Sequence, residues 1–553
     1  MLGGFAVCSQ QETRVDDLLR AVRGPGMTHR QRAPPPTPEH RPIQLCRFLV
    51  RDSGKLPPGC AIPGRLRAVP QSPLSFAAHL THGRQCRQTG KPMMSPTTAP
   101  LDAPRTLLVN RDPETASAIA VAVAARKVGA EEILARSLSR VDQLNQSLNA
   151  LVRLNPKALA EAQGVQSRVD RGERLPLAGV PVVIKDNLWV RGLEVTQGSR
   201  RYAGFVAPAD AVAVARLRAA GAVVLGIGAT SELACMGVTN TPLYGMTRNP
   251  VDPRLTPGGS SGGPAAAVAA GFAPLALGTD AGGSTRRPPA HVGVIGFKPS
   301  QDLVPYGPGF DEPVWGISVV CPIARCMEDI TLAMSVLAGI APAVPGPVTL
   351  AFALDFGLGQ VLDDEVAAVT IAAVERVRAT GVPVVEAAPT WPQASGRADV
   401  APLQWAGLAA LHGDSFRDDP TLFGPGIAEQ IERGLALNGV EVAAAHQASH
   451  RMGETLRAFL AQHPFLMTPT TPCPAWPVED IAPKVIGGRP ASPRDHASFT
   501  PQANHAGCPA ISLPCGKTRA GLPLGMQIMA APGQDAALLG LAERLAPVLS
   551  GAG

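Results

Sequence analysis

The sequence predicts an α/β fold built around one large β-sheet, on the basis of two observations. Amphipathic helices and short apolar strands alternate from about residue 104 to the C-terminus, which is the order expected of a layered α/β fold. Hydrophobic residues make up 45% of the 553 residues and charged residues 17%, a composition sufficient for a large core. No internal repeat with a period of about 20–50 residues is visible, so a repeat architecture is not expected.

The individual elements follow one another as this fold class requires. Residues 133–148 place apolar side chains at helical spacing with charged residues opposite, which predicts a helix. Residues 175–187 are typical of a buried strand that ends in a polar turn, and residues 211–226 of a helix, a glycine stop and a strand. The alternation continues with a strand at 348–356, a helix at 363–381 and a strand at 382–387.

Residues 1–92 lack such a pattern, because proline-rich segments interrupt every period. They contain 14 Lys and Arg against 5 Asp and Glu, a net +9, whereas the remainder has 36 against 39, a net −3. We expect either a disordered basic tail or, as the favoured interpretation, a segment upstream of a true start at Met93 or Met94. The slightly acidic body argues against direct nucleic-acid binding.

Cysteine usage and the lack of targeting signals indicate the compartment. None of the ten cysteines forms a CxxC pair, and the neighbouring Cys321 and Cys326 are expected to be core thiols rather than metal ligands. This usage suits a reducing compartment. No signal-peptide pattern is visible, and the longest apolar run, near residues 264–277, is too short to span a bilayer. We expect a cytoplasmic protein that needs no metal or other cofactor and does not bind membranes.

Two Gly-Gly-Ser turns, at residues 258–260 and 282–284, are the main chemical signal. Glycine permits positive φ and close approach of a ligand, so each turn can present a serine hydroxyl. A serine nucleophile needs a base within hydrogen-bond reach. Residues 258–263 formally match a GxSxG nucleophile elbow, but a loop precedes them and no downstream histidine stands out. A Ser-His-Asp hydrolase is therefore disfavoured.

Lys185 is the candidate base among the eight lysines. It directly follows the apolar run Pro181–Ile184, and burial behind such a strand lowers the pKa of a lysine, as a lysine base requires. The alternative is a structural lysine that caps the strand and pairs with Asp186.

Eight ordered motifs closely resemble those of the amidase signature family. The resemblance spans roughly residues 110–545, with the core motifs within 175–330. It implies one large domain, here residues 93–553, with a central mixed twisted sheet covered by helices on both faces. The motifs are GVPVVIKDN (179–187), GGSSGG (258–263), GTDAGGSTR (278–286), GVIGFKPS (293–300), ARCMEDI (324–330), FLMTPTTPCPAWP (465–477), NHAGCPAISLP (504–514) and GLPLGMQIMA (521–530).

The resemblance implies a role for each residue of the site. Ser284 would attack the amide carbonyl and carry the acyl group. Ser260, which follows a cis peptide in the family, would relay the proton to Lys185 as general base. The oxyanion hole would be formed by the backbone N–H groups of Ala281, Gly282, Gly283 and Ser284. As supporting residues we expect Asp280 and Arg286 to brace the Ser284 loop and Ser261 to bond locally beside the relay.

The implied activity is hydrolysis of a carboxamide C–N bond in a small, linear amide, by a single chain or a homodimer. The alternative is the amidase subunit of a tRNA-dependent glutamine amidotransferase, which works in a complex and passes ammonia to its partner. The third reading is a non-catalytic relative, against which the intact Lys185, Ser260 and Ser284 argue. The segments 301–320 and 390–460 match nothing distinctive, so the substrate is not identified.

The chain departs from the family pattern at three places. Gly226–Ala229 stands where GKTN is usual, Pro289 where a small residue is usual, and Cys321 where glycine is usual. These changes leave the three catalytic candidates intact, and we expect them to reshape the pocket.

Overall fold

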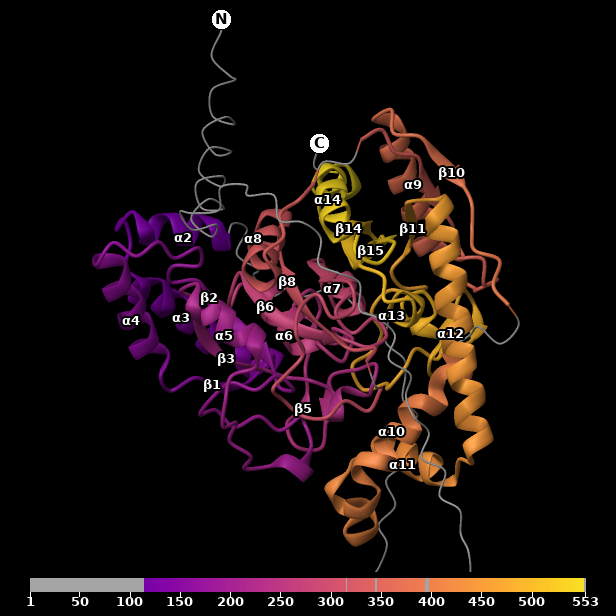
Figure 1. The fold of residues 1–553 in the computed structure, drawn as a ribbon, viewed down its shortest axis with the longest axis horizontal. Helices are drawn as coiled ribbons and strands as arrows, with labels where there is room; N and C mark the ends of the chain where they lie inside the picture. Colours follow the sequence, from indigo (N-terminus) through magenta and orange to yellow (C-terminus); the bar gives the residue numbers. More distant parts are fainter. Residues whose placement is uncertain (1–113, 315, 344–345, 393–396, 552–553) are drawn as a thin grey trace, which may run out of the picture. The chain divides into compact units, whose positions relative to one another are not determined.

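An eleven-stranded mixed β-sheet is the central element of the protein (Figure 1). The computed structural model describes residues 114–551 except 315, 344–345 and 393–396, and all of these belong to one compact unit. The expectations for residues 1–92 lie outside the described residues. In spatial order the strands are β1 (Leu151–Leu154), β3 (Val223–Gly228), β2 (Pro181–Lys185), β6 (Leu275–Asp280), β8 (Val319–Ala324), β7 (Ile295–Lys298), β14 (Ala510–Lys517), β15 (Pro523–Ala530), β11 (Phe465–Pro469), β9 (Leu350–Phe352) and β10 (Val384–Glu386).

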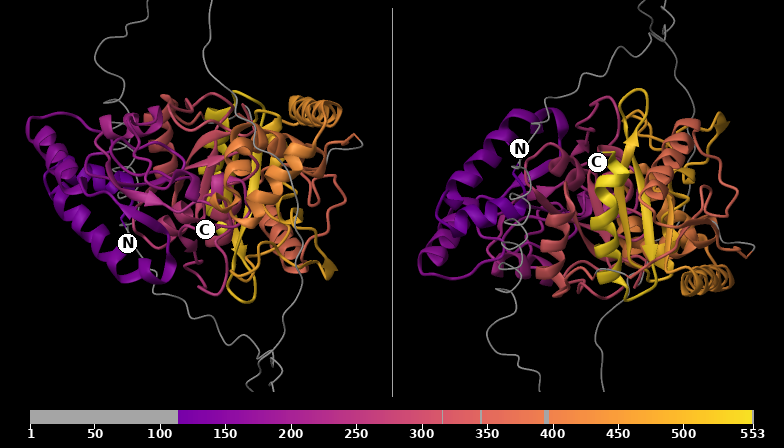
Figure 2. Two further views of the ribbon diagram at one scale, coloured as in Figure 1. Left: turned by 90° about the horizontal axis from the view of Figure 1, so that it is seen from below. Right: turned by 90° about the horizontal axis from the view of Figure 1, so that it is seen from above.

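Helices cover both faces of this sheet, as the two views of Figure 2 show. Two small hairpins lie outside it, β4 (Asn240–Thr241) with β5 (Gly245–Met246) and β12 (Val485–Ile486) with β13 (Arg489–Pro490). None of the described helices is both long and apolar enough to cross a membrane. The helices are α2 (Ala116–Ala124), α3 (Ala130–Leu148), α4 (Ala158–Asp170), α5 (Val212–Ala219), α6 (Gly262–Ala269), α7 (Arg287–Val292), α8 (Met327–Ala338), α9 (Asp364–Ala379), α10 (Arg397–Asp418), α11 (Pro425–Ala436), α12 (Gly439–Gln462), α13 (Pro501–His505) and α14 (Asp535–Ser550).

The elements predicted from hydrophobic spacing are all present, although the strands predicted over 175–187, 348–356 and 382–387 are shorter than expected. Helix α3, the α5–β3 pair and the β9–α9–β10 series lie where the sequence placed them. The strand predicted over 175–187 is regular only over Pro181–Lys185. The reason is Gly179, whose φ of 69° turns the chain just before the strand and brings it within contact of Ala130 in α3.

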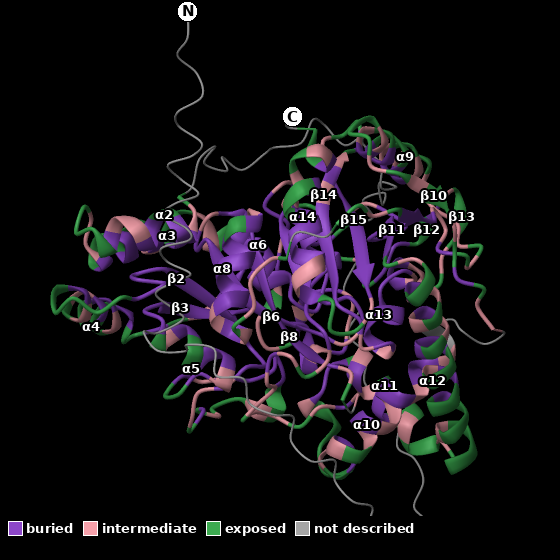
Figure 3. Ribbon diagram, turned by 45° about the horizontal axis from the view of Figure 1, so that its top comes forward, coloured by how far each residue is buried: buried purple, intermediate pink, exposed green. Residues whose placement is uncertain are grey.

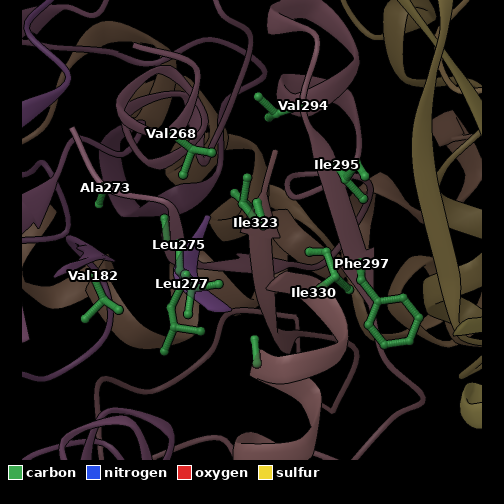
Figure 4. Packing of buried hydrophobic residues seen from close by; sticks show 14 of the residues in the cluster. Val182, Val268, Ala273, Leu275, Leu277, Val294, Ile295, Phe297, Ile323 and Ile330 are labelled. Atoms are coloured by element: carbon green, nitrogen blue, oxygen red, sulfur yellow. The ribbon is translucent and has the colours of Figure 1, made fainter. Parts of the chain in front are cut away.

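The strands around the middle of the sheet are fully buried and form the largest hydrophobic cluster. Val182 of β2, Leu275 and Leu277 of β6 and Ile323 of β8 pack together there (Figure 4). Figure 3 shows the same region buried while the outer faces of the surrounding helices are exposed. A strand buried on both faces reads as a continuous apolar run, which is why β2 was recognisable from the sequence, whereas no strand was predicted at β6.

The sheet topology sets the position of the functional residues. Strands β2 and β6 are parallel neighbours, with Val183 opposite Ala276 and Ile184 opposite Leu277. Because parallel strands end at the same edge of a sheet, Lys185 at the end of β2 lies beside the end of β6, from which the Ser284 loop starts. Helix α10 contacts both α11 and α12, and these three helices lie at the other end of the sheet from α2–α4 (Figure 1).

Candidate active site

Lys185 is fully buried and its amine contacts two hydroxyls. Its Nζ lies within hydrogen-bond distance of Ser260 Oγ at 2.8 Å and of Thr279 Oγ1 at 2.9 Å, with Thr279 O at 3.4 Å. Burial lowers the pKa of Lys185 to about 7, although Glu312 and Asp280 oppose this electrostatically. A large fraction of the lysine is therefore neutral at physiological pH, and a neutral amine can accept a proton.

The alternative role for Lys185, pairing with Asp186, is not what the structure shows. The Asp186 carboxylate instead accepts hydrogen bonds from Thr196 N at 2.8 Å, Thr196 Oγ1 at 2.7 Å and Gly198 N at 2.9 Å. No carboxylate among the described residues lies within 4.0 Å of Lys185 Nζ. Burial raises the pKa of Asp186 to about 6 despite these donors. Asp186 therefore holds the following loop in place, and the Lys185 amine contacts Ser260 instead of this carboxylate.

Thr279 and Asn187 were not singled out by sequence reasoning, yet both belong to the lysine's surroundings. Asn187 Nδ2 donates to Thr279 Oγ1 at 2.9 Å, so this hydroxyl contacts two nitrogens at once. Both residues are buried, and both lie close in sequence to residues that the sequence identified. Asn187 is two positions after Lys185, and Thr279 directly precedes Asp280. Parallel pairing of β2 with β6 was the signal that could have predicted their contact.

The first Gly-Gly-Ser turn lies against the lysine. The peptide between Gly259 and Ser260 is cis, and Ser260 is buried just before α6. A side chain at Gly259 would lie 2.7 Å from the Val238 backbone, so the turn fits only glycine there. Ser261 Oγ donates to Thr279 O at 3.3 Å, which ties the turn to the end of β6. The turn therefore fixes the Ser260 hydroxyl beside the amine.

The second turn carries Ser284, which lines a cavity. Ser284 is 8% exposed, and its hydroxyl has no hydrogen-bond partner among the residues that the structure describes. Over the same part of the chain, the backbone N–H groups of Ala281, Gly282 and Ser284 are also without an internal acceptor. The Gly283 N–H differs, because it donates to Asp280 Oδ1 at 2.7 Å. Three backbone N–H donors of residues that line this cavity are thus available.

A buried ion pair holds this loop. Arg286 donates through Nε to Asp280 Oδ2 at 3.0 Å and through NH2 to Asp280 Oδ1 at 2.9 Å, and both side chains are fully buried. Burial alone would raise the pKa of Asp280, but the Arg286 guanidinium holds it well below its usual range. Arg286 also donates to Thr500 O at 2.8 Å, and Asn504 Nδ2 donates to Asp280 O at 2.9 Å. The loop is therefore braced against α13 by charge-assisted hydrogen bonds.

The loop also needs glycine at position 283. Gly283 has a φ of 107°, and a side chain there would lie within 2.5 Å of Thr500 Cβ. Any other residue at position 283 would have a strained backbone, and its side chain would collide with Thr500, the residue directly before α13.

The cavity beside Ser284 has a volume of about 850 Å³. Its walls come from the Ser284 loop, from α10 and α11, and from the segment at 492–498. Val400 and Trp405 of α10 contribute apolar surface, and Arg287, Arg433 and Arg494 contribute positive charge. Segments 301–320 and 390–460 matched nothing distinctive in the sequence, and the second of these supplies most of the helical wall.

The departures from the family pattern are accommodated in different ways. Cys321 in β8 is buried directly opposite Gly278, which has no side chain, and burial raises the pKa of its thiol. Pro289 lies in the first turn of α7, where the missing N–H costs little. Within the described residues no group of three or more His, Cys, Asp or Glu side chains is arranged to hold a metal ion.

Comparisons with known proteins identify relatives over most of the chain. The model of the Amidase family matches residues 132–539. The glutamyl-tRNA(Gln) amidotransferase A subunit of Deinococcus radiodurans is 32% identical, covering 79% of this chain and 97% of that protein. An acylamidase of Rhodococcus erythropolis is 33% identical, covering 77% and 93% respectively.

Solved structures agree. A crystal structure of an amidase matches with a TM-score of 0.73 and 29% identity, covering 79% of this chain and 100% of that one. A 6-aminohexanoate cyclic dimer hydrolase complexed with substrate matches with a TM-score of 0.71 and 27% identity, covering 79% and 97%.

Proposed function

This chain belongs to the amidase signature family of amidohydrolases, and we propose that it hydrolyses a carboxamide through an acyl-enzyme on Ser284, with Ser260 and Lys185 as the proton relay. The observation that carries the proposal is the 2.8 Å contact between Lys185 Nζ and Ser260 Oγ in a fully buried setting. A lysine whose pKa is lowered to about 7 is a suitable general base near neutral pH.

The hydrogen-bond arrangement around Lys185 suits a neutral amine. Such an amine has two N–H groups and one lone pair. The N–H groups can donate to the Thr279 hydroxyl and to Thr279 O, which leaves the lone pair for the Ser260 proton. Ser260 in turn takes the proton of Ser284 as the latter attacks the carbonyl carbon. The C–N bond then breaks, and the relayed proton leaves with the amine.

The negative charge that develops on the carbonyl oxygen needs donors already in place. We propose the N–H groups of Ala281, Gly282 and Ser284 as these donors, since none of them has an internal acceptor in the described part of the chain. Gly283 belongs to the same turn, and its N–H would contribute only if it left Asp280. Water then attacks the acyl-enzyme by the reverse relay and releases the acid.

The proposal is tested by product release from purified protein. A panel of linear aliphatic, aryl and peptide amides, with a cyclic amide included, should give ammonia or amine from at least one compound. Lys185→Ala and Ser260→Ala should each lose most of that activity, because residues that act as a unit cannot substitute for one another. Ser139→Ala, on the exposed face of α3, is the matched control and should retain it. Activity within tenfold of wild type in either relay variant would overturn the mechanism.

A second candidate is the amidase subunit of a glutamine-dependent amidotransferase. It is favoured by the similarity to one component of such an enzyme, the Deinococcus radiodurans protein, over nearly the whole length of that component. The acylamidase is equally similar, so identity alone does not decide between the two. The two candidates differ in whether hydrolysis requires a partner. Full turnover by the isolated chain supports the stand-alone amidase, whereas glutamine hydrolysis that appears only with added amidotransferase components supports the second.

A further inference from the structure

The cavity beside Ser284 contains more positive than negative charge. Five of its lining residues carry formal charge, namely Arg287, Arg433, Arg494, Glu429 and Asp495. One opposite pair is already joined, because Arg433 NH2 lies 2.6 Å from Glu429 Oε1. The Asp495 carboxylate accepts the Ser492 N–H at 2.7 Å instead of a guanidinium. Two arginines of the wall therefore remain without a carboxylate.

Arg287 is the nearer of these two arginines in the sequence, three residues after Ser284. It is 4% exposed, and its NH1 contacts His496 Nδ1 at 3.0 Å. Its buried Nε has no hydrogen-bond partner within the described residues. The charge of Asp280 favours the charged form of Arg287, but both oxygens of that carboxylate accept hydrogen bonds from Arg286 and none from Arg287. A buried guanidinium without an anion is costly, and burial lowers the pKa of Arg287 to about 10.

Arg494 adds a second positive group to the same wall. It is half-buried, and its NH2 donates to the neutral Gln430 Oε1 at 3.1 Å. No carboxylate of the described chain lies within 4.0 Å of Arg494 or Arg287. Like charges repel each other, so the charges of Arg286 and Arg494 both oppose the charged form of Arg287 and lower its pKa. Such a pair is stabilised by an anion from outside the chain.

We propose that the substrate is an amide that also carries a carboxylate group, which Arg287 and Arg494 bind in the cavity beside Ser284. The inference rests on the proposed amidase function and names the substrate class for that site. Arginine suits this role because its planar fork binds a carboxylate through two hydrogen bonds. The apolar surface of Val400 and Trp405 in the same cavity suits a hydrocarbon spacer between the carboxylate and the amide.

The test compares matched substrates that differ only in the carboxylate. On the acyl side, the half-amides from succinamate to suberamate are each compared with the unbranched amide of the same carbon number, beginning with butyramide. On the amine side, N-acetyl-β-alanine is compared with N-propylacetamide. We expect the carboxylate compound of at least one pair to have a kcat/KM about tenfold or more above its neutral partner, the range typical of a charge-assisted hydrogen bond. The arm that shows the preference identifies which side of the amide bears the carboxylate.

Arg494→Gln should reduce this preference about tenfold or more by raising KM for the carboxylate compound. Arg519→Gln, at a 97% exposed arginine, is the control and should keep the preference. Binding is measured separately on Ser284→Ala protein, whose melting temperature should rise with succinamate or a longer half-amide and not with the neutral partner. This readout also serves if a substitution at the buried Arg287 prevents folding.

The substrate preference and the amidase mechanism are overturned by different results. Hydrolysis of neutral and carboxylate partners at equal kcat/KM, with no selective thermal shift, would overturn the carboxylate inference and leave the amidase intact. Release of product that persists in Ser284→Ala would overturn the proposed mechanism itself.

Discussion

The pH dependence of hydrolysis should follow the ionisation of Lys185. The proposed relay requires the neutral amine, and burial lowers the pKa of this lysine from 10.5 to about 7. That difference corresponds to about 5 kcal/mol against the ammonium form. With such a pKa, roughly a tenth of the lysine is neutral at about pH 6 and roughly nine-tenths at about pH 8. The value of kcat/KM should therefore rise about tenfold over this interval and level off above it.

The assay uses a neutral amide such as butyramide, so that the substrate itself does not titrate, and measures initial ammonia release across the range. His496 is the competing explanation, because it lines the cavity and its imidazole is a second candidate proton acceptor. His496→Gln should keep the rising limb if Lys185 is responsible. A limb that disappears in this variant, or one centred near the ordinary lysine value, would refute the reasoning.

Three substitutions in the Ser284 loop give further tests. Ser284→Ala should lower kcat by about a thousandfold or more with an unchanged melting temperature, and residual activity near wild type would exclude it as nucleophile. In a denaturant titration, Gly283→Ala should unfold more easily, and it should lose activity, because its Cβ would lie within 2.5 Å of Thr500 Cβ. The control is Gly164→Ala in helix α4, where a Cβ meets no other atom; its stability should be unchanged or slightly raised. Arg286→Gln should cost about 3–5 kcal/mol in free energy of unfolding because it leaves a buried carboxylate unpaired, and a loss below about 1 kcal/mol would show that the ion pair does not brace the loop.

The sequence was sufficient to predict β2, one of the two strands beside the site. This strand is buried on both faces, so it appears as an uninterrupted apolar run before the polar residues at the edge of the sheet. Strand β6 was not predicted, because its apolar residues continue the run that begins in α6. Resemblance to the family motifs predicted Lys185, Ser260 and Ser284 as catalytic residues without any spatial information. The start of β2 was placed too early, because the turn at Gly179 is apolar and cannot be distinguished from the strand by composition alone.

Contacts between segments that are distant in the sequence could not be predicted from it. Thr279 touches Lys185 only because β2 and β6 are paired in one register, and pairing is a long-range property. The buried network of Arg286 joins residues more than 200 positions apart, as with Gln527 and Asn504. The cavity wall is likewise assembled from α10, α11 and the 492–498 segment, whose local patterns contain no chemical signature.

The most direct test of the central claim is to capture the acyl-enzyme and locate it. The protein is mixed with p-nitrophenyl acetate, quenched in acid and digested, and the peptides are examined by mass spectrometry. We expect an acetyl group on Ser284 in the wild type and in no peptide of Ser284→Ala, with Lys185→Ala acylated far more slowly. An acetyl group on Ser260 in the wild type, or hydrolysis that proceeds with no adduct on Ser284, would contradict the assignment of nucleophile and relay.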